Sequence, residues 1–268
     1  MRNILLLIVF VFTSFAGSNQ NAPVKETLYE IKSAPNTAFT FGEKLTYRVH
    51  YGVLNGGDCY FEVDNKPIVA GEHSAYHIKV YGKSTGLVDV MFKVRDEFET
   101  YLDVDAMIPW RATKKVREGG YTDSDFIIFD HQRRVAISRR GKLDIPANTH
   151  DLISAIYYAR SLDMRNAKPG ELFPVTFFLD NKNYEFRFKF IGREEITTDA
   201  GTFKALKVMP QVIEGRIFKD SEAITLWVTD DENKVPLRAQ SDIWVGSLKA
   251  DLIEYKGLRN PLTSRISD

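Results

Sequence analysis

The segment from residue 148 to residue 164 is the one long helical pattern in a chain that otherwise alternates like strands. Its apolar residues leave almost no polar side on a helix: Leu152, Ile153, Ala155, Ile156, Tyr157, Ala159 and Leu162. A helix that is apolar nearly all round is a buried helix. Asn148 and Thr149 can cap its start, and Asp151 suits the positive end of the helix dipole. We therefore predict a buried helix at about 149–163, around which the strands on both sides must curl.

The rest of the chain between residues 39 and 258 has the pattern of short strands joined by turns. Apolar and polar residues alternate with a period close to two over 41–51 and over 184–191, and a long strand-like segment covers 88–104. About twelve strands follow one another at the spacing of an antiparallel meander. No strand–helix–strand repeat occurs. We therefore predict an all-β fold with one long helix: a strongly curved antiparallel sheet, or open β-barrel, of about twelve strands wrapped around that central helix.

The first eighteen residues have the pattern of a secretory signal peptide. Arg2 is followed by an unbroken apolar run, Ile4–Phe12, and then by small residues up to Ser18. The run is too short to span a bilayer comfortably, so we favour a cleaved signal peptide at 1–18 over a transmembrane anchor. We expect the mature chain to be exported to the periplasm, with the extracellular space as the alternative.

Behind the signal peptide the sequence predicts three segments. Residues 19–38 are polar and form a linker, 39–258 form a single β domain, and 259–268 form a polar tail. The single cysteine, Cys59, allows no internal disulfide and stands too far from the signal peptide to accept a lipid anchor. It has no basic neighbour that would make its thiol reactive. The mature protein is therefore expected to be soluble and to depend on its core.

Charge gives no indication of a nucleic-acid partner, because 36 basic residues balance 36 acidic ones. The hairpins over 111–142 are locally more basic and contain three basic pairs, Lys114-Lys115, Arg133-Arg134 and Arg139-Arg140. Such a patch suits anionic glycan or lipid head groups. We favour a solvated sheet edge that is guarded against aggregation.

No catalytic or metal-binding motif stands out. His73 and His77 flank a strand, where four residues span about 13 Å, too far for one metal ion. Two acidic pairs lack the spacing of a calcium loop and are better explained by turns, Asp123-x-Asp125 and Asp230-Asp231. We therefore predict no catalytic residue, no metal and no cofactor.

Three residues of the predicted helix are candidates for a structural or ligand-contacting site: Asp151, Tyr157 and Arg160. Asp151 and Arg160 are about 13 Å apart on a helix and cannot pair with each other. A guanidinium on an otherwise apolar helix needs a partner, either Asp163 or carbonyl groups at a sheet end. We favour a structural ion pair that fixes the helix inside the sheet over ligand binding. Ile156 and Tyr157 are predicted to be central core residues.

Four blocks occur in the order Phe41-Gly42-Glu43-x-Leu45-x-Tyr47, Asp151-Leu152-x-Ser154-x-x-Tyr157-Tyr158-x-Arg160, Thr198-Asp199-Ala200-Gly201-Thr202-Phe203 and Leu226-Trp227-Val228-x-Asp230-Asp231. Together they resemble the bacterial exported family called domain of unknown function 3108, from about Phe41 to Leu258. The resemblance implies a mostly β fold, similar to YmcC-like and lipoprotein-carrier-like half-barrels that wrap a helix. It implies no catalytic residue.

The leading functional hypothesis is a non-enzymatic envelope protein that binds an apolar or amphiphilic ligand, or a partner in envelope assembly. Lipid, lipoproteins and the envelope polysaccharide machinery are the partner classes in question. The alternative is a structural interaction module with a filled core and no small-molecule ligand. A hydrolase is disfavoured, since no nucleophile–base set is legible. Apolar space beside the helix would distinguish the first two hypotheses.

Overall fold

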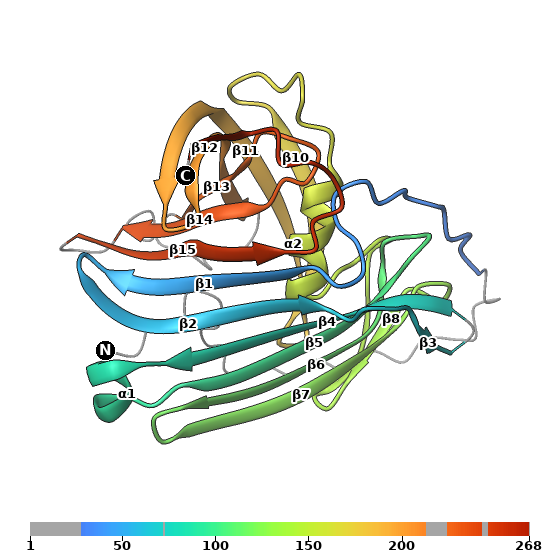
Figure 1. Cartoon of the computed structure of the whole chain (residues 1–268). Helices are drawn as coiled ribbons and strands as arrows, with labels where there is room; N and C mark the ends of the chain where they lie inside the picture. Colours follow the sequence, from blue (N-terminus) through green and yellow to red (C-terminus); the bar gives the residue numbers. More distant parts are fainter. Residues whose placement is uncertain (1–27, 72, 213–223, 243–245, 268) are drawn as a thin grey trace.

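One antiparallel sheet runs through almost the whole of the described chain (Figure 1). The computed structural model describes residues 28–71, 73–212, 224–242 and 246–267. Two helices lie within these residues, α1 (Gly86–Met91) and α2 (Leu152–Ser161). The strands are β1 (Lys44–Tyr51), β2 (Leu54–Val63), β3 (Ile68–Ala70), β4 (His73–Ser84), β5 (Arg95–Asp103), β6 (Pro109–Glu118), β7 (Tyr121–Asp130), β8 (Val135–Ser138), β9 (Gly141–Asp144), β10 (Leu172–Leu179), β11 (Lys182–Thr198), β12 (Gly201–Val212), β13 (Ile224–Thr229), β14 (Pro236–Asp242), β15 (Ser247–Lys256) and β16 (Arg265–Ser267).

The strand order is β10-β11-β12-β13-β14-β15-β1-β2-β4-β5-β6-β7-β8-β9, with β3 beside β4 and β16 beside β12. β9 and β10 are therefore the two edges, and the sheet curves around α2 without closing (Figure 1). This confirms the predicted open, strongly curved antiparallel sheet around a helix. Within the described residues the sheet has 16 strands, whereas the sequence predicts about twelve. β3, β9 and β16 are three or four residues long, too short to show an alternating pattern.

Helix α1 interrupts the segment over 88–104 that the sequence predicts as one strand. Its residues are GLVDVM, and none of them is buried. Two valines in so short a helix favour a strand by composition, because β-branched side chains fit a pleated surface. The prediction is therefore wrong for the first part of the segment, and the strand begins only at Arg95.

The N-cap of helix α2 is Asp151 rather than Asn148 or Thr149. The Asp151 carboxylate accepts hydrogen bonds from the backbone N–H of Ile153 (2.9 Å) and Ser154 (3.2 Å). The Ser154 hydroxyl in turn accepts the backbone N–H of Asp151 at 2.9 Å, which completes a capping box. Asp151 thus stabilises the first turn as the N-cap itself.

His150, the residue before the N-cap, pairs with the edge of the sheet. His150 donates its backbone N–H to the carbonyl of Thr176 (2.9 Å) and accepts the N–H of Phe178 (2.7 Å), beside edge strand β10. The helix is consequently shorter than the predicted 149–163, because the backbone just before it bonds to a strand.

Tyr157 and Ile156 on α2 are both predicted to be central core residues, but they differ in burial. Tyr157 is among the most buried side chains of the described chain, which confirms it as a core residue. Ile156 is only half-buried, so its prediction as a central core residue is wrong. Leu152, Ile156 and Ala159 follow one another at helical spacing and are all half-buried. This side of the helix is only partly covered, although its residues are apolar.

The polar segments at the two ends of the domain pack onto it. Ala38 is fully buried and Asn36 nearly so, although both fall in the predicted linker at 19–38. In the predicted tail at 259–268, Ser264 is buried and the following residues form β16. Both segments therefore contribute to the fold in part. Short side chains and backbone hydrogen bonds hold them, which a polar composition does not reveal.

The predicted signal peptide at 1–18 and its cleavage site lie outside the described residues, which begin at Leu28. Of the helices that the structure describes, none is long and apolar enough to cross a membrane.

Candidate functional site

A buried ion pair joins the last turn of α2 to the residue before β1. Arg160 Nη1 lies 2.6 Å from Glu43 Oε1, and Nη2 lies 2.8 Å from Oε2, a bidentate arrangement. The side chain of Arg160 is 3% exposed and that of Glu43 is 0% exposed. Arg160 also donates to the carbonyl of Asn233 (3.1 Å). The prediction that a carboxylate or backbone carbonyls hold Arg160 is confirmed.

The predicted pairing of Arg160 with Asp163 is wrong. Asp163 accepts hydrogen bonds from the exposed Arg165 instead, at 2.8 Å from its Nη2. Helix α2 ends before Asp163 is reached, so Asp163 does not share the buried side of Arg160. The true partner is Glu43, which is 117 residues away in sequence.

Aromatic rings enclose the Arg160–Glu43 pair. The guanidinium carbon lies 5.2 Å from the ring centroid of Tyr157 and 5.5 Å from that of Phe39. Burial raises the pKa of both Tyr157 and Tyr47, so their hydroxyls stay protonated. The cluster compensates both charges and excludes water. It offers neither a free acid nor a free base.

Asp151 ties the other end of α2 to the sheet. Besides capping the helix, its Oδ2 accepts a hydrogen bond from the hydroxyl of Thr100 on β5 at 2.6 Å. Burial raises the pKa of this carboxyl, and the hydrogen bonds from Thr100 and Ser154 act in the opposite direction. Both ends of α2 are thus fixed to strands by polar side chains.

A small apolar cleft lies beside the first turn of α2; we call it the helix-side cleft. It encloses about 40 Å³. Its apolar walls come from helix α2, from strands β5 to β7 and from the end of β10. The wall residues are Leu152 and Ile153 of the helix, Phe98, Ala112 and Ile127 of β5 to β7, and Phe178 and Leu179 of β10. Charged side chains line it as well, Lys114, Asp125, Asp151 and Asp180.

Beside this cleft, the turn between β10 and β11 meets the strands at the opposite edge of the sheet; we call this contact the seam. Lys114 Nζ lies 2.7 Å from Asp180 Oδ1, and Arg140 Nη1 lies 3.0 Å from the same oxygen. The amide of Asn183 donates to the carbonyl of Asp144 at 2.7 Å. No strand ladder joins β9 to β10 among the described residues. Apart from the single backbone bridge between His150 and β10, the two edges therefore meet through side chains.

The seam corrects the predicted role of one residue of the basic hairpins over 111–142, Lys114. Lys114 is buried, and Arg139 and Arg140 bind Asp123 at 2.9 and 3.0 Å. Asp123 itself lies on strand β7 rather than in a turn, with Lys114 3.1 Å away. These charges compensate one another. Lys114 is therefore a buried part of the seam, whereas Arg139 and Arg140 stay exposed at the edge.

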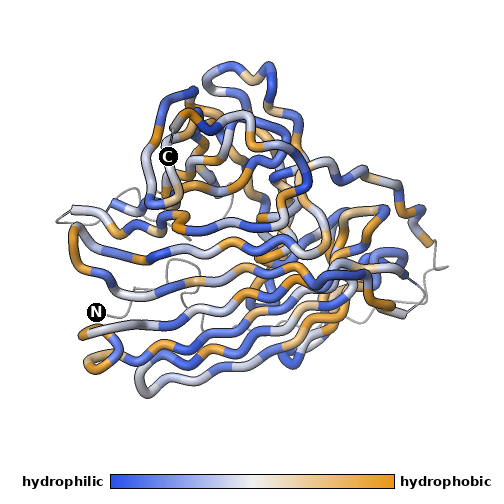
Figure 2. The backbone as a smooth tube through the Cα atoms, in the orientation of Figure 1, coloured by the Kyte–Doolittle hydropathy of each residue, from blue (hydrophilic) through white to orange (hydrophobic). Residues whose placement is uncertain are grey.

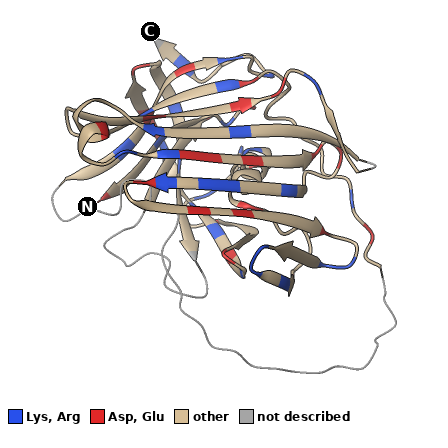
Figure 3. Ribbon diagram, turned by 90° about the horizontal axis from the view of Figure 1, so that it is seen from below, with Lys and Arg blue, Asp and Glu red and all other residues tan. Residues whose placement is uncertain are grey.

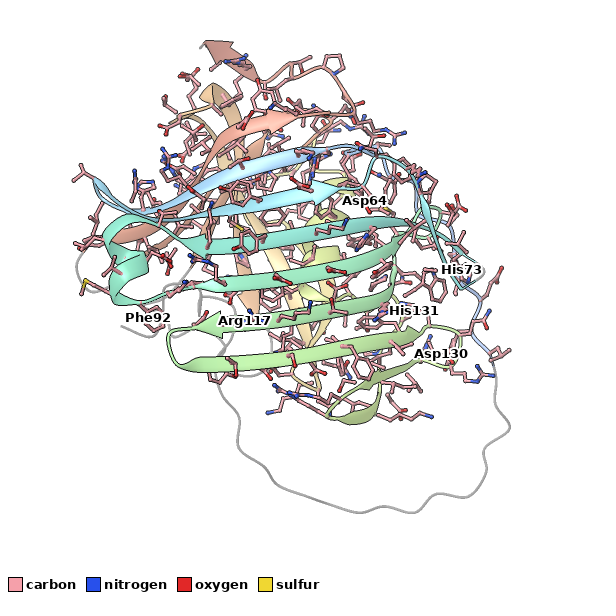
Figure 4. All side chains as sticks on the ribbon, turned by 60° about the horizontal axis from the view of Figure 1, so that its bottom comes forward. Asp64, His73, Phe92, Arg117, Asp130 and His131 are labelled. Atoms are coloured by element: carbon pink, nitrogen blue, oxygen red, sulfur yellow. The ribbon has the colours of Figure 1, made fainter. Side chains whose placement is uncertain are left out.

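The outer face of the sheet carries interleaved basic and acidic residues along β4 to β7 (Figure 3). His77 sits between Asp64 (2.8 Å) and Glu99 (3.2 Å) on this face. His73 stacks on the ring of Trp110 at 3.9 Å, so the two histidines belong to separate clusters. Figure 4 shows His73 and His131 at the end of the sheet opposite Phe92 and Arg117.

Two carboxyl groups without a cationic partner among the described residues face the interior near the other end of the sheet. Asp96 on β5 is buried and accepts the backbone N–H of Arg117 at 2.9 Å. The second carboxyl group is that of Glu118 at the end of β6, and burial and the neighbouring Asp96 raise its pKa to about 7.

Burial, with the nearby Asp96 charge, raises the pKa of the Cys59 thiol to about 12. Cys59 is therefore protonated and a poor nucleophile.

Glu118 predicts a pH dependence of stability. Its pKa is raised in the folded chain, so between its ordinary value of 4.5 and about 7 the folded state binds more protons than the unfolded state. The contribution of Glu118 to stability is thus complete below pH 4.5 and is lost as the pH rises through about 7. We expect Glu118→Gln to flatten the fall in melting temperature between these pH values. Glu97→Gln, at an exposed residue paired with Lys115, is the control. An unchanged slope in the Glu118→Gln variant would contradict the assignment.

Sequence reasoning missed three residues that build the interior. Glu43 stands in the first resemblance block, but nothing local links it to Arg160. Thr100 has no distinguishing context. Neither ring nitrogen of buried His150 has a hydrogen-bond partner in the described part of the chain, and burial lowers its pKa to about 3. The ring is therefore neutral and packs on Tyr158 at 4.5 Å.

An open antiparallel sheet around a buried helix defines a β-barrel-like protein. A solved structure shows the same fold, that of a β-barrel-like protein of the domain of unknown function DUF1849 from Brucella abortus. The two chains are 9% identical, with a TM-score of 0.53, over 81% of this chain and 97% of that one.

Within this class, the chain belongs to the family described as Protein of unknown function (DUF3108), whose sequence profile matches residues 46–253. This confirms the resemblance. Two other solved structures are similar at lower TM-scores. A presumed lipoprotein from Parabacteroides distasonis is 13% identical (TM-score 0.35; 85% of this chain, 100% of that one). A presumed exported protein with a YmcC-like fold from Bacteroides fragilis is 12% identical (TM-score 0.37; 84% and 99%). No curated protein matches the chain in sequence.

Proposed function

We propose that this chain is a non-enzymatic, exported envelope protein that binds an apolar or amphiphilic ligand in the helix-side cleft. The cleft supports this function because aliphatic and aromatic walls lie next to charged groups, Lys114 and Asp180. Such a combination suits an acyl or other apolar chain that carries a polar head. Lipid, a lipoprotein and the envelope polysaccharide machinery are the sources of ligand or partner that we consider.

The small volume of the cleft implies that a ligand of lipid size enters only when the seam opens. The cleft encloses about 40 Å³, whereas ligand pockets commonly enclose about 300–1,000 Å³. The turn between β10 and β11 is held at the seam by ion pairs and side-chain hydrogen bonds. The backbone adds one bridge here, from His150 to β10, so the turn can move without breaking a continuous strand ladder. The single observation that carries the proposal is this apolar cleft beside an edge contact that lacks a continuous strand ladder.

Export is supported by the pattern of the first eighteen residues, with a basic start, a short apolar run and small residues before Asn19.

The non-enzymatic assignment is supported by the interior groups. The Cys59 thiol is held protonated, Asp151 caps a helix, and Arg160 is committed to Glu43. Each of these candidate residues serves the packing of α2 or the core.

The alternative function is a structural interaction module with a filled interior. The same small volume favours it, since such a module needs no apolar space beside α2. Lipid extraction and mass spectrometry of protein purified from its native envelope distinguish the two. A copurifying amphiphile supports the first function, and its reproducible absence supports the module.

A disulfide across the seam tests the proposed entry route. The Ser138 hydroxyl lies 3.4 Å from the side-chain oxygen of Asn181. We expect Ser138→Cys/Asn181→Cys, in a Cys59→Ala background, to form a disulfide that reduces binding of a fluorescent fatty acid by about tenfold or more, because the open form is depleted. Reduction should restore binding.

Ser138→Cys alone in the same background is the control, and it should respond to neither oxidant nor reductant. If the oxidised and reduced double variants bind the fatty acid equally well, the seam is not the entry route. If the wild-type protein neither binds the probe nor carries a lipid, the ligand function is wrong and the module remains.

A further inference from the structure

Helix α1 has its polar and apolar sides reversed relative to an ordinary surface helix. Leu87, Val90 and Met91 are 64%, 83% and 69% exposed, and no residue of the helix is buried. A helix on a soluble protein normally turns such a stripe toward the core. Since α1 adds nothing to the core, packing does not explain its apolar residues.

The reversed orientation is fixed by polar contacts. Asp89 faces the sheet together with half-buried Val88, and Arg95 binds the Asp89 carboxylate in a bidentate way at 2.7 and 3.2 Å. The Ser84 hydroxyl donates to the same carboxylate at 2.6 Å. The backbone N–H of Thr85 donates to the carbonyl of Gly56 at 3.0 Å, which ties the helix to β2. These contacts hold the apolar side toward the solvent.

The turn between β1 and β2 extends the same apolar surface. Val53 is fully exposed and Leu54 is 52% exposed. The bond from Thr85 to Gly56 places this turn beside α1, and Figure 2 shows both as hydrophobic regions at one end of the molecule. We call the five side chains the apolar tip: Val53, Leu54, Leu87, Val90 and Met91. They project from the end of the sheet.

Three cationic residues lie beside the apolar tip. Lys83 and Lys93 flank α1 in sequence, and Arg117 lies on β6, near Phe92 at the end of the sheet that carries α1 (Figure 4). None of the three forms a salt bridge with an acidic side chain in the described residues. The acidic residue of the helix, Asp89, is already paired with Arg95. Three cations thus stand next to the tip, with Asp58 across from Lys83 and Glu118 next to Arg117 as the nearby acidic groups.

We propose that the apolar tip docks on an anionic lipid bilayer, with Leu87, Val90 and Met91 inserted at the level of the head groups. Projecting apolar side chains next to cations fit a bilayer surface, where apolar burial and attraction to anionic lipid act together. The helix is ~9 Å long, comparable to the depth of the interfacial region. A protein partner would need a complementary hollow, while a bilayer accepts a projecting tip without one. This site is independent of the helix-side cleft and of its ligand.

Vesicle flotation tests the proposal. The probe is a vesicle of phosphatidylethanolamine and phosphatidylglycerol, with phosphatidylcholine vesicles for comparison. We expect the purified protein to bind the anionic vesicles. Leu87→Ser/Val90→Ser/Met91→Ser should lower the partition coefficient by on the order of tenfold or more. Lys83→Gln/Lys93→Gln/Arg117→Gln should lower it by a similar factor and remove most of the salt dependence.

The matched control removes three exposed apolar side chains elsewhere, as Val69→Ser/Ile128→Ser/Ile266→Ser, and should leave partition unchanged. The wild type and all variants share one N-terminus, so a difference in partition coefficient reports on the tip. Equal melting temperatures of the wild type and the tip variant show that the tip variant folds. Equal partition of the wild type and the tip variant, whether high or absent, overturns the proposal. So does a tip-dependent dimer in the absence of vesicle binding, which would make the tip a contact between copies.

Discussion

Arg160→Met is expected to lower the free energy of unfolding by about 3–5 kcal/mol, since it leaves one member of a buried ion pair without its counter-charge. Glu43 is 0% exposed, and the bidentate contact to Arg160 is its only salt bridge in the described chain. Methionine fills most of the space but neutralises nothing. Urea unfolding followed by tryptophan fluorescence measures the change.

Arg165→Met is the matched control, because Arg165 also pairs with a carboxylate but is 68% exposed. Removing an exposed pair should change stability by about 1 kcal/mol or less. The double variant Arg160→Met/Glu43→Leu should recover much of the loss, as apolar replacement of a whole buried pair is often tolerated. Equal effects of Arg160→Met and Arg165→Met would contradict a structural role for the buried pair.

The same variant separates structure from ligand binding. Arg160 does not line the helix-side cleft. Under conditions where Arg160→Met remains folded, we expect it to bind a fluorescent fatty acid as the wild type does. A folded variant that loses the probe would place the end of α2 within the binding site.

Phe39→Ala is expected to lower the free energy of unfolding by about 3–5 kcal/mol, as a large aromatic side chain leaves a cavity. The ring is fully buried and lies 4.7 Å from that of Tyr157 and 4.9 Å from that of Tyr76, measured between centroids. The same denaturation experiment measures it. Phe126→Ala, at a residue 39% exposed on the outer face, is the control and should cost about 1 kcal/mol or less.

If Phe39→Ala were as mild as Phe126→Ala, the segment before β1 would be a loose extension of the sheet. A large effect would instead show that the residues next to the predicted linker complete the core around α2. Ile156→Ala offers a comparison within the helix. Since Ile156 is only half-buried, its effect should fall below that of Phe39→Ala.

The sheet and the central helix could be predicted because their signals are local. Alternation with a period of two marks a strand with one buried face, and an apolar run at 148–164 marks a buried helix. Helix α1 could not be predicted in this way, since its valines match a strand and polar contacts from Asp89 fix it. The half-burial of Ile156 was equally invisible, because an apolar residue does not show which neighbour covers it.

The candidate site could be predicted only on its helical side. An arginine in an apolar helix demands a partner, but its local sequence offers only Asp163, and the true partner is 117 residues away. The seam was missed for a related reason. Asp123 and Asp125 look like turn residues until Lys114, Arg139 and Arg140 are placed around them. Pairing between distant segments comes from topology, which periodicity alone does not encode.

The hydrogen bonds of Arg160 also set an order of events during folding. Arg160 needs Glu43, 117 residues earlier, and the carbonyl of Asn233, 73 residues later. The two halves of the sheet join where β1 pairs with β15. A chain that emerges from its N-terminus can form the hairpins from β1 to β9 early, but α2 is locked only after residue 233 has arrived. Because such distant contacts form slowly, the half-made sheet stays exposed until late in synthesis, with β1 as an unpaired edge that can bind other chains.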